Sequence, residues 1–167
     1  TNQNIIGWYM SEKYDGIRAI WNGKTFVSRT GKKFNYVPPW YIEDFPKDIT
    51  LDGELWISRG NFQNIVGISN LKISKTRTAE NIDMIWENVI YIVFDLPKSS
   101  KLFEERMLEL KEISSHLNHV KFANQIQIEN IEQLNKLYND LISKGAEGVI
   151  LRKFASPYEQ KRSKFML

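Results

Sequence analysis

The chain has 167 residues, 42% of them hydrophobic, and a net charge of +3. This length and composition predict one globular domain with a buried core, and no apolar run is long enough to cross a membrane as a helix. The absence of cysteine excludes disulfides and thiolate metal sites. A mildly basic chain is compatible with binding a polyanion but does not require it.

The first half of the chain is dominated by strand signals. Short apolar or alternating segments bounded by turn residues predict strands at 8–13, 16–21, 25–29 and 51–58. Asn22-Gly23 predicts a type I′ hairpin turn between the second and third of these strands. Residues 61–68 favour a short helix, and the polar residues 72–77 favour a loop.

A buried strand and two helices are predicted in the second half. Residues 89–94 are all apolar and Pro97 ends the run, which is typical of a buried strand. Apolar stripes predict helices over 102–117, with Ser100 as its cap, and over 131–142, with Gly145 as its stop. A last strand is predicted at 148–153. Strands that come first and helices that follow indicate a mixed α+β fold.

Lys13-Tyr14-Asp15-Gly16-Ile17-Arg18 is the segment with the clearest chemical content. A free lysine is a poor nucleophile near neutral pH because its pKa is about 10.4. Desolvation and neighbouring cations lower that pKa, and a lysine activated in this way can form a covalent intermediate. The spacing alone is also compatible with ordinary surface charges around a turn glycine.

Four further segments accompany this lysine along the chain. Leu51–Trp56, with Glu54, and Glu147–Lys153 each place an acid on or beside an apolar strand. Tyr91–Leu96 places the aromatic residue Phe94 before an acid at a strand end, and Lys161–Lys164 is a basic cluster. In order and spacing, the lysine segment and the first three resemble the motifs of the nucleotidyltransferase domain of ATP-dependent DNA ligases. Residues 11–19 and 51–56 are most similar to the small ligases of bacteria, phages and large DNA viruses.

The resemblance implies a fold and a set of roles. The fold would be the ATP-grasp-like nucleotidyltransferase domain, with antiparallel sheets flanked by helices. Lys13 would attack the α-phosphorus of ATP and carry AMP as a phosphoramidate. Arg18 and Glu54 would contact the ribose, and Phe94 would stack on adenine. Glu147 would hold Mg²⁺, which prefers carboxylate oxygens together with water and phosphate.

The resemblance also implies how DNA would be bound. Asp15 would assist the later transfer of AMP to DNA and would hold the metal together with Glu147. Arg29 would contact the nick 5′-phosphate or the nucleotide phosphates, a task that suits a planar guanidinium. Lys72, Lys75 and Arg77 are candidates for contacts with DNA phosphates, although a solvated loop is an equally good interpretation.

The resemblance stops at the end of the sequence. The family's fifth motif places two lysines after an apolar pair, and here the apolar pair Met166-Leu167 ends the chain. We therefore interpret residues 1–167 as an adenylyltransferase domain that stops before that motif. An OB-fold is expected downstream and is absent from this chain, so sealing by the chain alone should be weak. The expected partner is nicked duplex DNA, bound by an intracellular monomer that does not associate with a membrane.

Three alternatives remain open at this point. An RNA ligase and an mRNA capping guanylyltransferase belong to the same superfamily and also use a lysine nucleophile. A non-catalytic nucleic-acid-binding remnant of the fold is the third. The first and third motifs are more similar to DNA ligases, and the presence of Lys13, Glu54 and Glu147 together favours a working enzyme.

Overall fold

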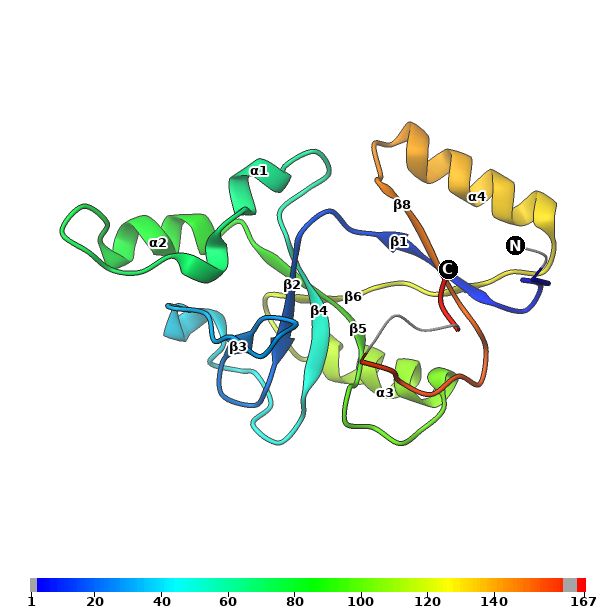
Figure 1. The fold of residues 1–167 in the computed structure, drawn as a ribbon, viewed down its shortest axis with the longest axis horizontal. Helices are drawn as coiled ribbons and strands as arrows, with labels where there is room; N and C mark the ends of the chain where they lie inside the picture. The colour runs from blue at the N-terminus through cyan, green and yellow to red at the C-terminus, as the bar shows by residue number, and fades with distance from the viewer. Residues whose placement is uncertain (1–2, 161–164) are drawn as a thin grey trace.

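A computed structural model describes residues 3–160 and 165–167 of the chain, so the basic cluster 161–164 lies outside the described residues. Two β-sheets lie side by side with helices packed against them (Figure 1). The larger sheet has the order β3-β2-β4-β5-β6, with strands Phe26–Val27, Ile17–Trp21, Leu51–Trp56, Ile90–Asp95 and Val120–Phe122. The smaller sheet has the order β7-β1-β8, with strands Ile126–Gln127, Tyr9–Lys13 and Gly148–Arg152. Neighbouring strands run antiparallel except β5 and β6, which are parallel.

The helices lie on both sheets and at one end of the molecule. Their bounds are Phe62–Ile65 for α1, Ala79–Trp86 for α2, Phe103–Ser115 for α3 and Ile131–Ser143 for α4, with short 3₁₀ turns η1 at Pro39–Tyr41 and η2 at Ile68–Asn70. Helix α3 packs on β5 and β6, and α4 lies along β8 (Figure 1). Helices α1 and α2 form an extension at the far end of the larger sheet. No helix in the described part of the chain is long and apolar enough to cross a lipid bilayer.

The chain passes from one sheet to the other within the lysine segment. Strand β1 ends at Lys13 in the smaller sheet, and β2 begins at Ile17 in the larger sheet. Position 16 in this crossover requires glycine, because a Cβ atom there would lie only 2.2 Å from the carbonyl oxygen of Leu55. Gly53 is required on β4 for a similar reason, since its Cβ would lie 2.4 Å from the carbonyl oxygen of Ile92. Both glycines therefore allow close backbone contacts that hold the segments carrying Lys13 and Glu54.

Aromatic side chains fill the core of the larger sheet. Phe26 packs edge-on against Tyr91 with ring centroids 4.8 Å apart and lies parallel to Trp86 at 6.0 Å. The buried Tyr91 hydroxyl donates to the carbonyl oxygens of Ala19 (2.8 Å) and Leu51 (3.0 Å), so its polar end is satisfied. Buried rings of this kind stabilise the sheet that carries three of the predicted site residues.

Several predicted boundaries are corrected by the structure. The hairpin after β2 is a four-residue connection and not a type I′ turn, because only Gly23 has a positive φ. Asn22 instead accepts backbone N–H bonds from Lys24 and Thr25 through its side-chain oxygen, both at 3.0 Å. The predicted helix over 61–68 is divided, because Gly67 adopts φ 83° between α1 and η2.

Helix ends and one whole helix also differ from the predictions. Ser100 is not the cap of α3; the helix begins at Phe103, and the Glu105 carboxylate accepts the backbone N–H of Leu102 at 3.2 Å. Helix α2 was not predicted, although Thr78 caps it and Ile82 and Trp86 are buried one turn apart. Gly145 ends α4 with φ 85°, as predicted. No residue of α4 is buried, so its apolar stripe covers β8 only in part.

Candidate active site

A cavity of about 180 Å³ lies between the two sheets. It is lined by the predicted site residues Lys13, Arg18, Glu54 and Phe94, together with Ser11, Glu12, Tyr14, Ala123, Gln125, Ile150, Arg152 and Met166. Lys13 comes from the smaller sheet, whereas Arg18, Glu54 and Phe94 come from three strands of the larger sheet. Residues as far apart in the sequence as Ser11 and Met166 thus contribute to one concave surface.

Lys13 is paired with Glu147 at the edge of this cavity. Lys13 lies opposite Gly148 in the register of β1 and β8, which brings the preceding residue, Glu147, beside it. The Lys13 ammonium forms an ion pair with the Glu147 carboxylate, and both side chains are about half exposed. Glu147 therefore belongs to the site through its contact with Lys13, although it does not line the cavity itself.

Arg18 is held by a buried carboxylate that the sequence analysis did not place in the site. Nε and Nη2 of Arg18 donate to the two carboxylate oxygens of Asp52, each at 2.6 Å, and Asp52 is fully buried. The hydroxyl of Tyr158 donates to the same carboxylate at 2.8 Å. The guanidinium carbon lies 4.6 Å from the ring centroid of Phe94. Asp52 thus fixes the direction of Arg18 over the aromatic ring.

Glu54 lies opposite Arg18 in the register of β2 and β4. Burial raises the pKa of the Glu54 carboxyl to about 7, against the opposing effects of the Arg18 guanidinium and a hydrogen bond from the Gly16 backbone. The negative charges of Asp52 and Glu147 add to the increase. The ionised form of Glu54 is therefore costly in this cavity, as expected for a group placed to bind a ligand.

This pKa predicts a pH-dependent effect of Glu54→Gln on stability. A carboxyl whose pKa is higher in the folded state favours the fold at low pH, so the wild-type chain loses stability as the pH rises from 4.5 to about 7. We expect Glu54→Gln to exceed the wild type in free energy of unfolding by up to about 3 kcal/mol at pH 8. The difference should shrink toward pH 4.5. Urea unfolding at several pH values measures it, with the exposed Glu43→Gln as baseline; a difference independent of pH would contradict the prediction.

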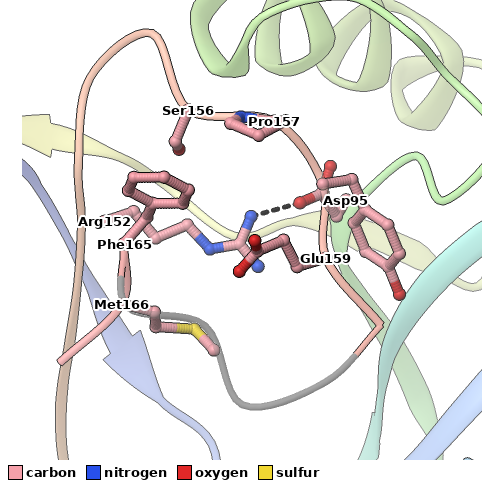
Figure 2. A pocket seen from close by; sticks show the side chains of 8 residues that line it. Asp95, Arg152, Ser156, Pro157, Glu159, Phe165 and Met166 are labelled. Carbon is pink, nitrogen blue, oxygen red and sulfur yellow. Dashed lines mark hydrogen bonds and ion pairs between the residues drawn. The ribbon is translucent and has the colours of Figure 1, made fainter.

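Arg152 links the two sheets beside the cavity. It extends from β8 to form an ion pair with Asp95 at the end of β5 (Figure 2). Asp95 also accepts hydrogen bonds from Nε and Nη2 of Arg106 at 2.7 and 3.3 Å, and both Asp95 and Arg106 are almost completely buried. Arg106 donates to the carbonyl oxygen of Ser156 at 2.8 Å. This network fixes the strand end that carries Phe94.

The remaining predicted residues lie outside the cavity. The Asp15 carboxylate accepts the indole N–H of Trp56 at 3.0 Å. Arg29 is exposed and lines a second cavity of about 550 Å³, which shares Arg18 with the first. Three exposed cations lie on the loop between η2 and α2, which is at the opposite end of the molecule from β8 (Figure 1), namely Lys72, Lys75 and Arg77.

The donor set suits a weakly held Mg²⁺ better than a closed metal site. Among residues 3–160 and 165–167, no group of three or more histidine, aspartate or glutamate side chains is arranged to hold a metal ion. Mg²⁺ commonly uses one or two carboxylates and takes its other ligands from phosphates and water. Glu147, paired with Lys13 at the edge of the cavity, fits that role, and one oxygen of the Asp15 carboxylate is engaged by the indole N–H of Trp56.

Sequence reasoning missed several residues that support the site. Asp52 and Asp95 were visible as acids on apolar strands, but their arginine partners lie 34 and 11 residues away. Gln125 follows β6, a three-residue strand with too little pattern to predict. Gln125 lines the cavity because β6 pairs with β5.

Comparisons with known proteins agree with this geometry. Residues 2–167 match the family model of the ATP dependent DNA ligase domain. A DNA ligase of Haemophilus influenzae is 34% identical over 171 residues, which cover 99% of this chain and 59% of that protein. A DNA ligase of Methanosphaera stadtmanae is 31% identical over 173 residues, which cover 93% of this chain and 31% of that protein.

Solved structures give the same result. A structure from a structure–function analysis of Lig E DNA ligases superposes with a TM-score of 0.83 at 28% identity, covering 99% of this chain and 62% of that chain. The adenylate of Chlorella virus DNA ligase superposes with a TM-score of 0.73 at 25% identity and the same coverage. The chain spans about three fifths of the length of these relatives and of the Haemophilus ligase. On the match over residues 2–167, the chain belongs to the ATP-dependent DNA ligase domain family.

Proposed function

We propose that this domain transfers AMP from ATP to Lys13, and that the ligase containing it passes AMP to a nick 5′-phosphate and seals the strand. The observation that carries the proposal is that one cavity gathers a lysine, an arginine, a half-buried glutamate and an aromatic ring from two sheets. Sealing is assigned to the whole enzyme because the chain covers 59% of its Haemophilus relative. The downstream OB-fold and the monomeric state stay predictions.

Lys13 is the proposed nucleophile. Its neutral Nζ would attack the α-phosphorus of ATP, forming an N–P bond as the bond to the bridging oxygen breaks and pyrophosphate leaves. The Glu147 carboxylate binds Nζ of Lys13, so this contact must open before Nζ can reach the α-phosphorus. A Mg²⁺ ion held by Glu147 would neutralise charge on the phosphates.

Three residues of the larger sheet are proposed to bind the nucleoside. The ring of Phe94 provides a flat apolar surface on which adenine can stack. Nε and Nη2 of Arg18 donate to Asp52, whereas Nη1 makes no hydrogen bond to that carboxylate. Arg18 and the ionised Glu54 would then bind the ribose hydroxyls from opposite positions on paired strands.

DNA is proposed to approach from the side of Arg29. The second cavity shares Arg18 with the nucleotide cavity, so a phosphate bound by Arg29 would lie next to the bound AMP. Asp15, close to Lys13 in the crossover, is proposed to assist the transfer to that phosphate. Lys72, Lys75 and Arg77 are proposed to contact phosphates farther along the duplex, where they would add affinity that decreases with salt.

The test measures covalent adducts and sealing. The chain is incubated with Mg²⁺ and either ATP or GTP, and its mass is determined; the ligase containing it is then assayed on nicked DNA and nicked RNA. We expect a slowly formed AMP adduct and sealing of nicked DNA. A GMP adduct would indicate a capping enzyme, and sealing of RNA alone would indicate an RNA ligase. Absence of any adduct, with retained DNA binding, would indicate a non-catalytic binding domain.

A further inference from the structure

Gln125 lines the nucleotide cavity and carries a polar atom without a partner. Its side-chain oxygen Oε1 is buried and has no hydrogen-bond partner. In the described part of the chain, four residues each have one buried side-chain polar atom without a partner. Of these four residues, Gln125 lines this cavity. A buried acceptor without a partner is costly, and such atoms in a binding cavity point to a ligand that satisfies them.

The backbone fixes the orientation of the Gln125 amide. Its Nε2 donates to the carbonyl oxygen of Ala123 at 3.1 Å. A carbonyl oxygen can only accept, so the NH₂ group must face Ala123 and the reverse amide orientation would place two acceptors together. The unpaired atom is therefore the oxygen, and Gln125 offers the cavity an acceptor.

The loop that carries Gln125 is tied to the strand that carries Phe94. The backbone N–H of Ala123 donates to the carbonyl oxygen of Val93 at 2.9 Å, which ties the loop after β6 to the end of β5. Phe94 and Gln125 line the same cavity, so a base stacked on Phe94 would share that cavity with Gln125. Glu12, another potential acceptor that lines the cavity, is already engaged, because Arg59 donates to both of its carboxylate oxygens at 2.9 Å.

We propose that Gln125 Oε1 accepts a hydrogen bond from the exocyclic amino group of adenine and so selects ATP. Adenine carries an amino donor at the 6-position, whereas guanine carries a carbonyl acceptor there. Guanine would therefore face Gln125 acceptor to acceptor and leave the buried oxygen unpaired. This assignment rests on the proposed nucleotide-binding function and names the residue that determines its base specificity.

The test combines a nucleotide analogue with a substitution. ATP is compared with purine riboside triphosphate, which lacks the 6-amino group, by calorimetric binding and by the rate of adduct formation. We expect the wild-type chain to prefer ATP by about 10- to 100-fold. In Gln125→Met, ATP should fall to the level of the analogue while the analogue itself is unchanged. GTP should stay the weakest ligand of the wild type.

A second glutamine provides the matched control. Gln127 also donates its Nε2 to a backbone carbonyl, that of Gly7 at 3.1 Å, but it is exposed and does not line the cavity. Gln127→Met should keep the full preference for ATP. Equal binding of ATP and the analogue by the wild type would overturn the assignment whether or not the variant folds. If Gln125→Met binds ATP well and still prefers ATP to the analogue, the assignment of Gln125 is wrong but the proposed function stands. If the wild-type chain binds no nucleotide, both the assignment and the proposed function are wrong.

Discussion

Lys13→Ala is expected to abolish the covalent AMP adduct and to leave the fold intact. The residue ends β1, and its side chain is 51% exposed, so its removal leaves no cavity in the core. Its ion pair with Glu147 is exposed as well, and pairs of that kind contribute at most about 1 kcal/mol. Adduct formation is measured by mass after incubation with ATP and Mg²⁺, and stability by urea unfolding.

Two further variants separate the nucleophile from its charge. Lys13→Arg keeps a cation beside Glu147 but cannot act as an amine nucleophile, so it should also lack the adduct. Lys101→Ala removes another half-exposed lysine that is paired with a carboxylate, Glu109, and should keep the adduct. An adduct that persists in Lys13→Ala on a different lysine would show that the nucleophile has been assigned to the wrong residue.

The segments that carry chemistry could be predicted because their signals are local. The strands around Lys13, Glu54 and Phe94 are each encoded by five or six consecutive residues with an apolar pattern, and the structure confirms all three. The mixed α+β class follows from the same local patterns. The prediction that Lys13, Arg18, Glu54 and Phe94 share one site came from the resemblance to a family, and all four residues line the cavity between the sheets. Their individual roles stay predictions.

The contacts that organise the site could not be predicted, because they join distant residues. The pairing of Arg18 with Asp52 requires the register of β2 on β4, and that of Arg152 with Asp95 requires the two sheets to meet. Strands β6 and β7 have only three and two residues, which is too short for a periodic signal. Gln125 was invisible for that reason.

A substitution at Asp95 is expected to have the largest effect on stability. Asp95→Ala leaves the Arg106 guanidinium, which is 1% exposed, without its carboxylate partner in the interior. Removal of one member of a buried ion pair typically costs about 3–5 kcal/mol, because the remaining charge stays desolvated. We therefore expect the free energy of unfolding to fall by about that amount in urea titrations at pH 7. Asp95→Asn, which keeps a carbonyl acceptor for Arg106, should lose less.

Two comparisons distinguish a buried charge network from simple loss of packing. Glu109→Ala breaks the exposed pair with Lys101 and should change stability by at most about 1 kcal/mol. In Asp95→Ala/Arg106→Met, the desolvated charge is removed together with its partner, so part of the stability lost in Asp95→Ala should return. The double variant could instead be less stable than Asp95→Ala by the full cost of a second core substitution. That result would show that β5 is held in place by the packing of these side chains and not by their charges. In that case the link from Asp95 to Arg152 would not be what fixes the strand end that carries Phe94.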